Sequence, residues 1–224
     1  MNNYWIFAAP LLLAGFCQAW TKEEVYEKLA TERSHSLVAY HAKVSSTIKY
    51  GEMAALNDSG SMSFSPPNCF KMIMYKAGTE NSGCGDTTWS KTKDGKVTRS
   101  VEPGGAEAGA PKSPNLKDML RGMDFRILGD KPNGNLEIEA TLKQDGMSIK
   151  ANMLLDTRKW LLKRMSFTTP QGETMEIGYN YRELAGEDIM SEINTVFGTG
   201  GFVRMKFIDF KKISPLPSKD FKIF

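Results

Sequence analysis

The chain offers few side chains that could carry out acid–base chemistry. His35 and His41 are its only histidines, and they lie six residues apart across a change from helical to extended pattern, so local geometry does not bring their rings together. Glu137 and Glu139 alternate along one predicted strand, which is typical of a solvated strand face rather than of an acid–base pair. No nucleophile elbow, zinc-protease helix, phosphate loop or dinucleotide fingerprint occurs, and the glycine-rich run 198–201 precedes a strand and predicts a turn. The sequence therefore predicts a protein that is not an enzyme and needs no cofactor.

Two cysteines, Cys69 and Cys84, follow the N-terminal segment. A redox or metal site would need Cys-x-x-Cys spacing or neighbouring histidines, and neither is present. Facing residues of an antiparallel hairpin have a constant sum of residue numbers, and for this pair the turn falls between Lys76 and Ala77, where turn-forming residues follow. The two cysteines can then face each other across neighbouring strands at a distance that a disulfide spans. In an oxidising compartment we expect one structural disulfide between them.

Methionine is abundant, with 13 residues in the chain, and many of them fall in phase on predicted strands or helix stripes. A flexible, polarizable side chain suits a surface that adapts to varied apolar shapes, although each single methionine is also an ordinary core residue. The pair Met72 and Met74 resembles a soft ligand set for copper, but no His-rich or Met-rich tract accompanies it, and we predict no metal site. The methionines in phase are Met72, Met74, Met119, Met123, Met147, Met153, Met165, Met175 and Met205.

The pattern of apolar residues predicts a short helix followed by many strands. Thr21 and Glu24 have the spacing of a capping box, and the helix is expected over residues 22–34. From residue 38 the apolar period changes from 3.6 to 2, which is the signal for strands. The strongest hairpin signal is Asp145-Gly146, a two-residue turn between two alternating runs. The predicted strands are 38–50, 60–65, 70–76, 86–91, 96–101, 136–142, 147–155, 159–168, 175–181 and about 202–211.

Three segments interrupt this series of strands. Residues 102–114 have the Gly-, Ala- and Pro-rich composition of a flexible linker. Residues 115–123 and 186–197 carry apolar stripes at helical spacing, and both are expected to be helices. Eight or so antiparallel strands joined by tight turns form one twisted sheet, and one of its faces must be covered. We therefore expect an α+β fold, a curved antiparallel half-barrel sheet with helices covering its concave face.

The N-terminal segment predicts export. Residues 6–16 are an apolar run too short to span a membrane and suited to a secretory signal, and small residues at Cys17 and Ala19 place the cleavage after residue 19. Lipidation at Cys17 and a retained anchor are the alternatives, and Phe16 interrupts the pattern expected before a lipidated cysteine. The mature chain, 20–224, is expected to form a single periplasmic domain. The charges of the whole chain are well mixed around a net charge of +3, without a basic cluster typical of nucleic-acid binding.

The order of these elements and several short stretches form a familiar combination. A helix leads into a long alternating strand, Trp89 lies in a strand before an Asp-Gly turn, and the run 155–167 is followed by the turn 168–172. The middle segment is Gly60-Ser61-Met62-Ser63-Phe64 and then Pro66-Pro67-Asn68-Cys69-Phe70, and the chain ends in 207–211, Pro215-Leu216-Pro217 and 221–224. In these features the chain resembles the outer-membrane lipoprotein carrier (LolA) family and its wider fold group of LolB receptors and RseB-type sensors.

The resemblance implies a half-closed barrel with a helical lid over an apolar cavity for acyl chains. It implies a monomeric periplasmic carrier or chaperone that shuttles lipoproteins, or another acylated ligand, toward the outer membrane, with membrane-bound donor and acceptor proteins as partners and no nucleic acid. The alternative is a lipid- or lipoprotein-sensing module of the same fold that does not shuttle. At the place of the family's distinctive arginine this chain has Pro66. The expected cavity lining is Phe70, Met72, Met74, Trp89, Leu120, Met123, Ile138, Met165 and Tyr179.

Overall fold

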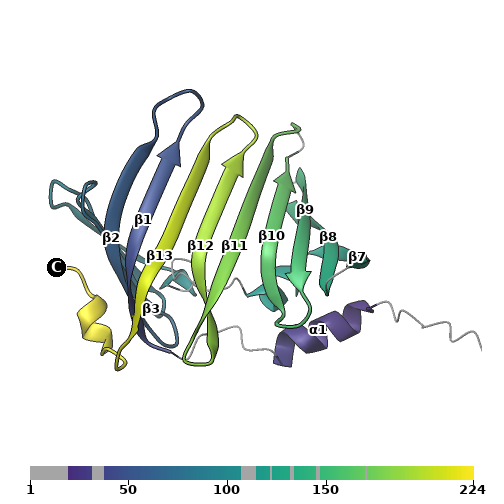
Figure 1. Ribbon diagram of the computed structural model, residues 1–224, viewed down its shortest axis with the longest axis horizontal. Coiled ribbons are helices and arrows are strands. Elements are labelled where there is room, and N and C mark those ends of the chain that lie inside the picture. Colours follow the sequence, from purple (N-terminus) through teal and green to yellow (C-terminus); the bar gives the residue numbers. More distant parts are fainter. Residues whose placement is uncertain are drawn as a thin grey trace, which may run out of the picture.

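One antiparallel sheet dominates the molecule (Figure 1). A computed structural model describes residues 20–31, 38–106, 115–121, 123–131, 134–144, 147–169 and 171–224. The strands of this part of the chain are β1 (Tyr40–Lys49), β2 (Leu56–Ser65), β3 (Cys69–Met74), β4 (Thr79–Cys84), β5 (Thr87–Lys91), β6 (Val97–Val101), β7 (Asp124–Lys131), β8 (Asn135–Gln144), β9 (Met147–Asp156), β10 (Leu161–Thr168), β11 (Thr174–Leu184), β12 (Glu187–Phe197) and β13 (Phe202–Lys212).

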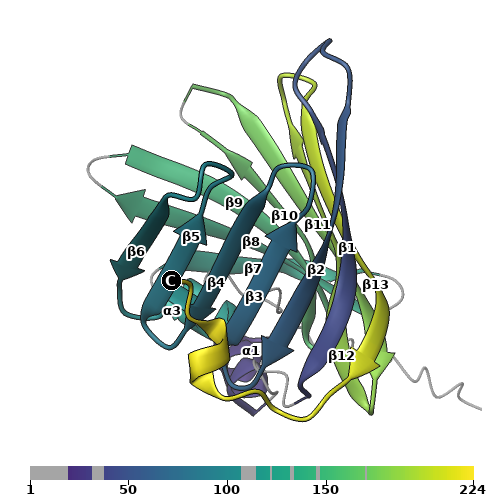
Figure 2. The same cartoon turned by 90° about the vertical axis from the view of Figure 1, so that its left-hand side faces the viewer.

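The strand order is β6-β5-β4-β3-β2-β1-β13-β12-β11-β10-β9-β8-β7, so the first and last strands of the chain meet in the middle of the sheet. The two edges are β6 and β7, which do not pair with each other, and the barrel is therefore open. Figure 2 shows the sheet curling, so that β3–β6 and β7–β9 lie on opposite sides of one concave face. The expected large antiparallel sheet is confirmed, and its thirteen described strands comprise the ten predicted segments and three strands that the sequence analysis did not assign.

Two short α-helices, α1 (Lys22–Thr31) and α3 (Leu116–Arg121), lie within the segments that the sequence assigned to helices. The capping box forms as predicted: the Thr21 N–H donates to Glu24 Oε2 at 2.8 Å, and the Glu24 N–H donates to Thr21 Oγ1 at 3.2 Å. The Tyr26 hydroxyl donates to the Leu120 carbonyl at 2.9 Å and joins the two helices.

Helix α1 lies at one end of the sheet, near the turn between β9 and β10 (Figure 1), and α3 packs against it. There the Trp20 and Trp160 rings meet edge to face, with centroids 5.1 Å apart. Val25 of α1 and Leu120 of α3 are fully buried in the hydrophobic core that the sheet also forms. The helices are thus held by this core rather than by their own short length.

The prediction of a helix over 186–197 is wrong, because this segment is strand β12. Ile189 and Ile193 are four residues apart, a spacing that fits a helical stripe and an alternating strand equally well. Val196, which would continue the helical stripe, is 42% exposed. Hydrogen bonds to β11 on one side and β13 on the other fix the segment as a strand in the sheet interior, and such pairing overrides a local apolar period.

Two strands escaped the sequence analysis. β4 has the sequence Thr-Glu-Asn-Ser-Gly-Cys, which lacks apolar alternation, and only the pairing of the cysteines implied a strand there. β7 begins at Asp124, directly after the predicted helix 115–123, and the sequence analysis assigned no element to its residues. Hydrogen bonds to a neighbouring strand place both segments in the sheet. The pattern of apolar residues within a segment does not reveal such pairing.

The first residues of the predicted linker 102–114 are bound to the rest of the protein. The Glu102 N–H donates to the Asp86 carbonyl at 2.9 Å, and the Ala106 N–H donates to the Gly85 carbonyl at 3.1 Å. Ala106 is fully buried, and a Cβ on Gly83 would meet its methyl group at 2.8 Å, so this contact requires glycine. Residues 102–106 are therefore docked on β4, whereas 107–114, the signal segment 1–19 and His35 lie outside the described residues.

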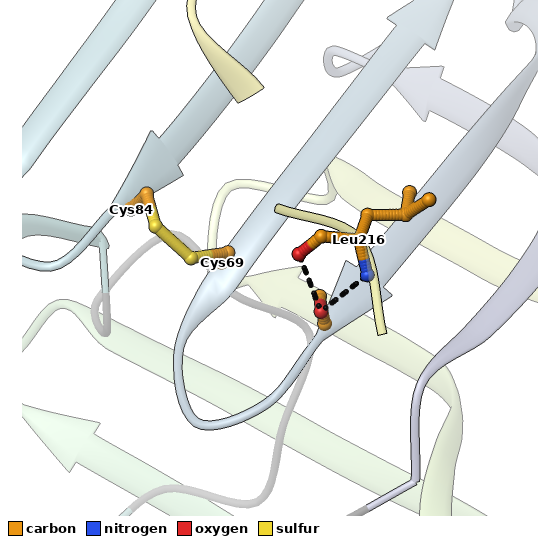
Figure 3. The surroundings of a disulfide bond; sticks show 4 residues. Cys69, Cys84 and Leu216 are labelled. Atoms are coloured by element: carbon orange, nitrogen blue, oxygen red, sulfur yellow. Dashed lines mark hydrogen bonds between the residues drawn. A yellow bond between two sulfur atoms is a disulfide. The ribbon is translucent and has the colours of Figure 1, made fainter. Parts of the chain in front are cut away.

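The disulfide between Cys69 and Cys84 is present, and its Cα atoms are 4.1 Å apart. Phe70 pairs with Gly83, so the hairpin has the residue-number sum that the sequence predicted. The C-terminal tail docks beside it (Figure 3): the Ser65 hydroxyl accepts the Leu216 N–H at 3.0 Å and donates to the Leu216 carbonyl at 3.3 Å. The 3₁₀ helix η1 (Ser218–Phe221) then contacts β3 and β4, with Phe221 buried.

The register separates an apolar face from a polar face of the sheet. One row of paired residues from β11 to β7 is Ile177, Met165, Met153, Ile138 and Ile127. The adjacent row on the opposite face is Glu176, Ser166, Asn152, Glu139 and Arg126. We call these the inner and outer faces. Glu139 accepts a 2.9 Å bond from Arg126, as expected for a carboxylate on the solvated face.

Asp156, at the end of β9, is held in an ion cluster that makes stability depend on pH. Burial raises the pKa of its carboxyl, but bonds from Lys163 at 3.0 Å and from Arg158 outweigh that effect and lower the pKa to about 2. Because the folded pKa lies below the unfolded one, the carboxylate stabilises the fold above pH 4, by up to about 2 kcal/mol, and this contribution is lost as the pH falls toward 2.

We expect Asp156→Asn to lower the free energy of unfolding at pH 7, and the deficit to shrink between pH 4 and pH 2. Urea titrations of both proteins across this range measure it. Asp209→Asn is the control, since that carboxylate pairs with Lys43 in a largely exposed position and contributes less. A deficit that is independent of pH would contradict the assignment to the charged carboxylate.

Candidate functional site

The inner face is filled along most of its area and open at one end. The open end has a hollow of about 610 Å³, a size typical of small-molecule sites. Four apolar side chains from neighbouring strands lie on its floor, Ile149 of β9, Phe167 of β10, Met175 of β11 and Phe197 of β12. The register pairs Phe167 with Met175 and Met175 with Phe197, so they share the inner face.

The rim of the hollow is polar. It is formed by the turn between β10 and β11, with Thr169, Gln171 and Glu173, and by Thr199 in the turn between β12 and β13. The two turns touch: the Gly198 N–H donates to the Thr174 carbonyl at 2.8 Å, and a Cβ on Gly198 would lie 2.8 Å from the Thr174 hydroxyl. The run 198–201 is thus a turn, as predicted, and glycine permits this close approach. An apolar floor inside a polar rim suits an apolar ligand with one end in water.

The nominated cavity residues lie mostly in the core. Eight of the nine belong to the hydrophobic cluster or pack against it, and the ninth, Trp89, is half-buried. Leu120 and Ile138 are fully buried, and burial raises the pKa of the Tyr179 phenol, which keeps that group neutral. The nominated residues in or against the cluster are Phe70, Met72, Met74, Leu120, Met123, Ile138, Met165 and Tyr179.

A second hollow, of about 380 Å³, lies on the inner face of β3–β6. Phe70 and Met72 line one side of it, so the structure brings these two nominated residues together. Trp89 also borders it, but the register pairs Trp89 with Ser82 and Ser82 with Lys71, which assigns its side chain to the outer face. The remaining lining is polar, with Asn81, Ser82, Thr88, Ser90, Thr98 and Ser100.

Sequence reasoning missed the floor of the larger hollow. Met175 appeared among the methionines in phase, but Ile149, Phe167 and Phe197 were not singled out. Phe167 and Phe197 are the inner-face residues of their strands nearest to the turns at the open end, and Ile149 is at the second inner-face position from its turn, after position 147. That position is a usable signal, because side chains close to turns are the last to be covered by packing.

The polar side chains that line the larger hollow are hydroxyls, one amide and one carboxylate, that of Glu173. Within the described residues, no group of three or more His, Cys, Asp or Glu side chains could hold a metal ion. His41 lies on the outer face, with Nδ1 3.1 Å from the Ser63 hydroxyl, away from both hollows. In the same part of the chain, no helix has the length and apolar character needed to cross a bilayer.

Comparison with solved structures identifies the architecture. A LolA-superfamily protein from Nitrosomonas europaea shares 15% identity and a TM-score of 0.58, covering 92% of this chain and 99% of its own. An outer-membrane lipoprotein-sorting protein domain from Vibrio parahaemolyticus shares 15% identity and a TM-score of 0.60, covering 87% and 93%. The fold is LolA-like. A DUF1329-family protein from Desulfovibrio piger, 12% identical, has a TM-score of 0.63 and covers 89% and 96%.

The LolA-like match spans nearly the whole of each neighbour, so it includes the sheet that carries both hollows. No protein-family model matches the sequence, and no curated protein matches it significantly. The expectation of a LolA-like fold is therefore confirmed by shape. At 12–15% identity the likeness concerns the fold alone.

Proposed function

We propose that this protein is a periplasmic carrier that binds the acyl chains of a lipoprotein, or of another acylated ligand, and takes them toward the outer membrane. The observation that carries the proposal is the 610 Å³ hollow with its floor of Ile149, Phe167, Met175 and Phe197. One of the similar structures is named as a lipoprotein-sorting domain, which agrees with such a cargo. The expected signal segment 1–19 would deliver the mature chain to this compartment.

The physical basis is the transfer of methylene groups out of water. Each buried CH₂ contributes about 0.8 kcal/mol, so about ten of them supply about 8 kcal/mol before the loss of chain freedom on binding. A dissociation constant near the micromolar range follows as the best case. Such an affinity is strong enough to hold an insoluble chain and weak enough to release it.

We infer that the helices cover the end of the concave face near the turn between β9 and β10, and that they leave the end with the larger hollow to the ligand. Val25 and Leu29 of α1 and Leu120 of α3 belong to the core at the first of these ends. The turns that bound the hollow, with Thr169 and Thr199, belong to the opposite end, which can receive a chain without moving a helix. Release would then depend on the turns rather than on a helical lid.

A titration tests the proposal. We expect the purified mature protein to bind a fluorescent sixteen-carbon fatty acid with one saturable site and to release it when palmitate is added. Transfer of the bound probe to phospholipid vesicles would support the carrier, whereas saturable binding without transfer would favour the sensing module. The absence of saturable binding would exclude both readings.

A further inference from the structure

The edge strand β6 presents an unused row of backbone hydrogen-bonding groups. It pairs with β5 on one side, and no described strand pairs with its other side. The opposite edge, β7, has an irregular register between Ile127 and Gly129, which protects an edge from strand addition. β6 pairs without such a shift, and Val97 and Val101 are 37% and 61% exposed along it. β6 is therefore the edge that can accept another strand.

The β5–β6 hairpin also carries cations without partners. Residues 91–99 hold four basic side chains, Lys91, Lys93, Lys96 and Arg99, against the single acid Asp94. Among the described residues none of the four basic groups forms an ion pair. The Asp94 carboxylate instead accepts bonds from the Thr92 hydroxyl and the Lys96 N–H. Glu80, which faces Lys91 across the strands, pairs instead with Lys71 at 2.6 Å.

The inner side of the same edge is the smaller hollow. Asn81, Ser90 and Thr98 form one paired row across β4, β5 and β6, and Thr88 and Ser100 belong to the next row. Ser100 donates to Glu102 at 3.0 Å, while the other four polar side chains make no hydrogen bond within the described chain. The hollow of about 380 Å³ beside the edge thus offers free donors and acceptors.

We propose that an extended acidic segment of another polypeptide adds to β6 as a further strand. Main-chain bonds to the edge would supply affinity, and alternate side chains of the added strand would face opposite sides of the sheet. Those facing inward enter the hollow beside Thr98 and Ser100. Those facing outward meet Arg99 and Lys91, which the register places on the outer face, and carboxylates there form charge-assisted bonds.

The basic side chains also argue against a second copy of this chain as the strand that is added to β6. Two β6 edges pairing antiparallel would bring Arg99 of one copy close to Arg99 of the other, and like charges on facing strands repel. The same side chains that attract an acidic strand therefore reject self-association. This inference concerns the outer edge of the sheet and does not depend on acyl binding in the larger hollow.

A synthetic peptide with alternating residues tests the proposal, for example acetyl-Thr-Glu-Val-Glu-Thr-Glu-Val-Glu-amide. We expect saturable binding that shifts the backbone amide resonances of residues 97–101, weakens with salt, and falls at least tenfold in affinity in the triple variant Lys91→Gln, Lys96→Gln, Arg99→Gln. A peptide with lysine in place of glutamate should bind at least tenfold more weakly. The same should hold for a glutamate peptide methylated on every backbone nitrogen, which keeps its charge but has no N–H group to donate to β6.

Three results would overturn the proposal. They are equal binding of the methylated peptide, equal binding of the lysine peptide, and amide shifts that avoid β6. A dimer in sedimentation that is abolished by Arg99→Glu would instead assign the edge to a second copy. Fatty-acid titration of the triple variant should match the unmodified protein, so a failure here is distinguishable from a failure of the carrier proposal.

Discussion

Replacing Met175 with aspartate should lower the affinity for a fatty-acid probe at least tenfold. Met175 lies between Phe167 and Phe197 on the floor of the larger hollow. A bound acyl chain would have to displace the water around the new carboxylate, and an unpaired charge facing hydrocarbon is costly. The fatty-acid titration measures the effect, since a tenfold change corresponds to about 1.4 kcal/mol.

Two further variants make the result specific. Met175→Leu keeps the apolar floor and should retain the affinity. Leu128→Asp introduces the same charge at a half-exposed position on β7, outside the hollow, and should also leave binding unchanged. Equal losses in the Met175 and Leu128 aspartate variants would mean that net charge, not the hollow, governs binding.

Removal of the disulfide should have the largest effect on stability. The Cys69–Cys84 bridge closes a loop with a sequence separation of 15, and the chain-entropy relation assigns about 3 kcal/mol to such a loop. We expect the double variant Cys69→Ala, Cys84→Ala to lose about that much free energy of unfolding in urea titrations. Residues 216–223, which dock on β2–β4 beside the bridge, should also exchange their amide hydrogens faster.

The unmodified protein in reducing buffer is the matched control, because it loses the covalent bond but keeps both cysteine side chains. It should show most of the loss. A deficit below about 1 kcal/mol in both cases would mean that the hairpin and the docked tail hold this region without the bridge.

Much of the fold was predictable because local pattern and global pairing agree in it. The alternation on both sides of residues 145–146 predicted the β8–β9 hairpin, and the cysteine pair predicted the register of β3 with β4. β12 was not predictable in this way, since Ile189 and Ile193 satisfy two periods at once. Hydrogen bonds to its neighbours β11 and β13 decide the outcome, and the spacing of apolar residues within β12 does not reveal them.

The candidate site was harder to predict than the sheet. Inner-face residues such as Ile138 and Met165 look the same in sequence as Phe167 and Met175, because all of them obey the same alternation. Which of them are buried depends on the curvature of the sheet and on where the helices pack. The first two lie in the core and the last two line the hollow.

The central claim is that an acyl chain lies in the hollow at the open end of the inner face. Photolabelling with a sixteen-carbon fatty acid that carries a diazirine near its methyl end tests it most directly, with the labelled peptides mapped by mass spectrometry. Labels at Ile149, within 167–175 and within 197–199, removed by excess palmitate and by Met175→Asp, are the predicted result. Labels confined to the outer face or to the C-terminal tail, or labelling that palmitate does not reduce, would contradict it.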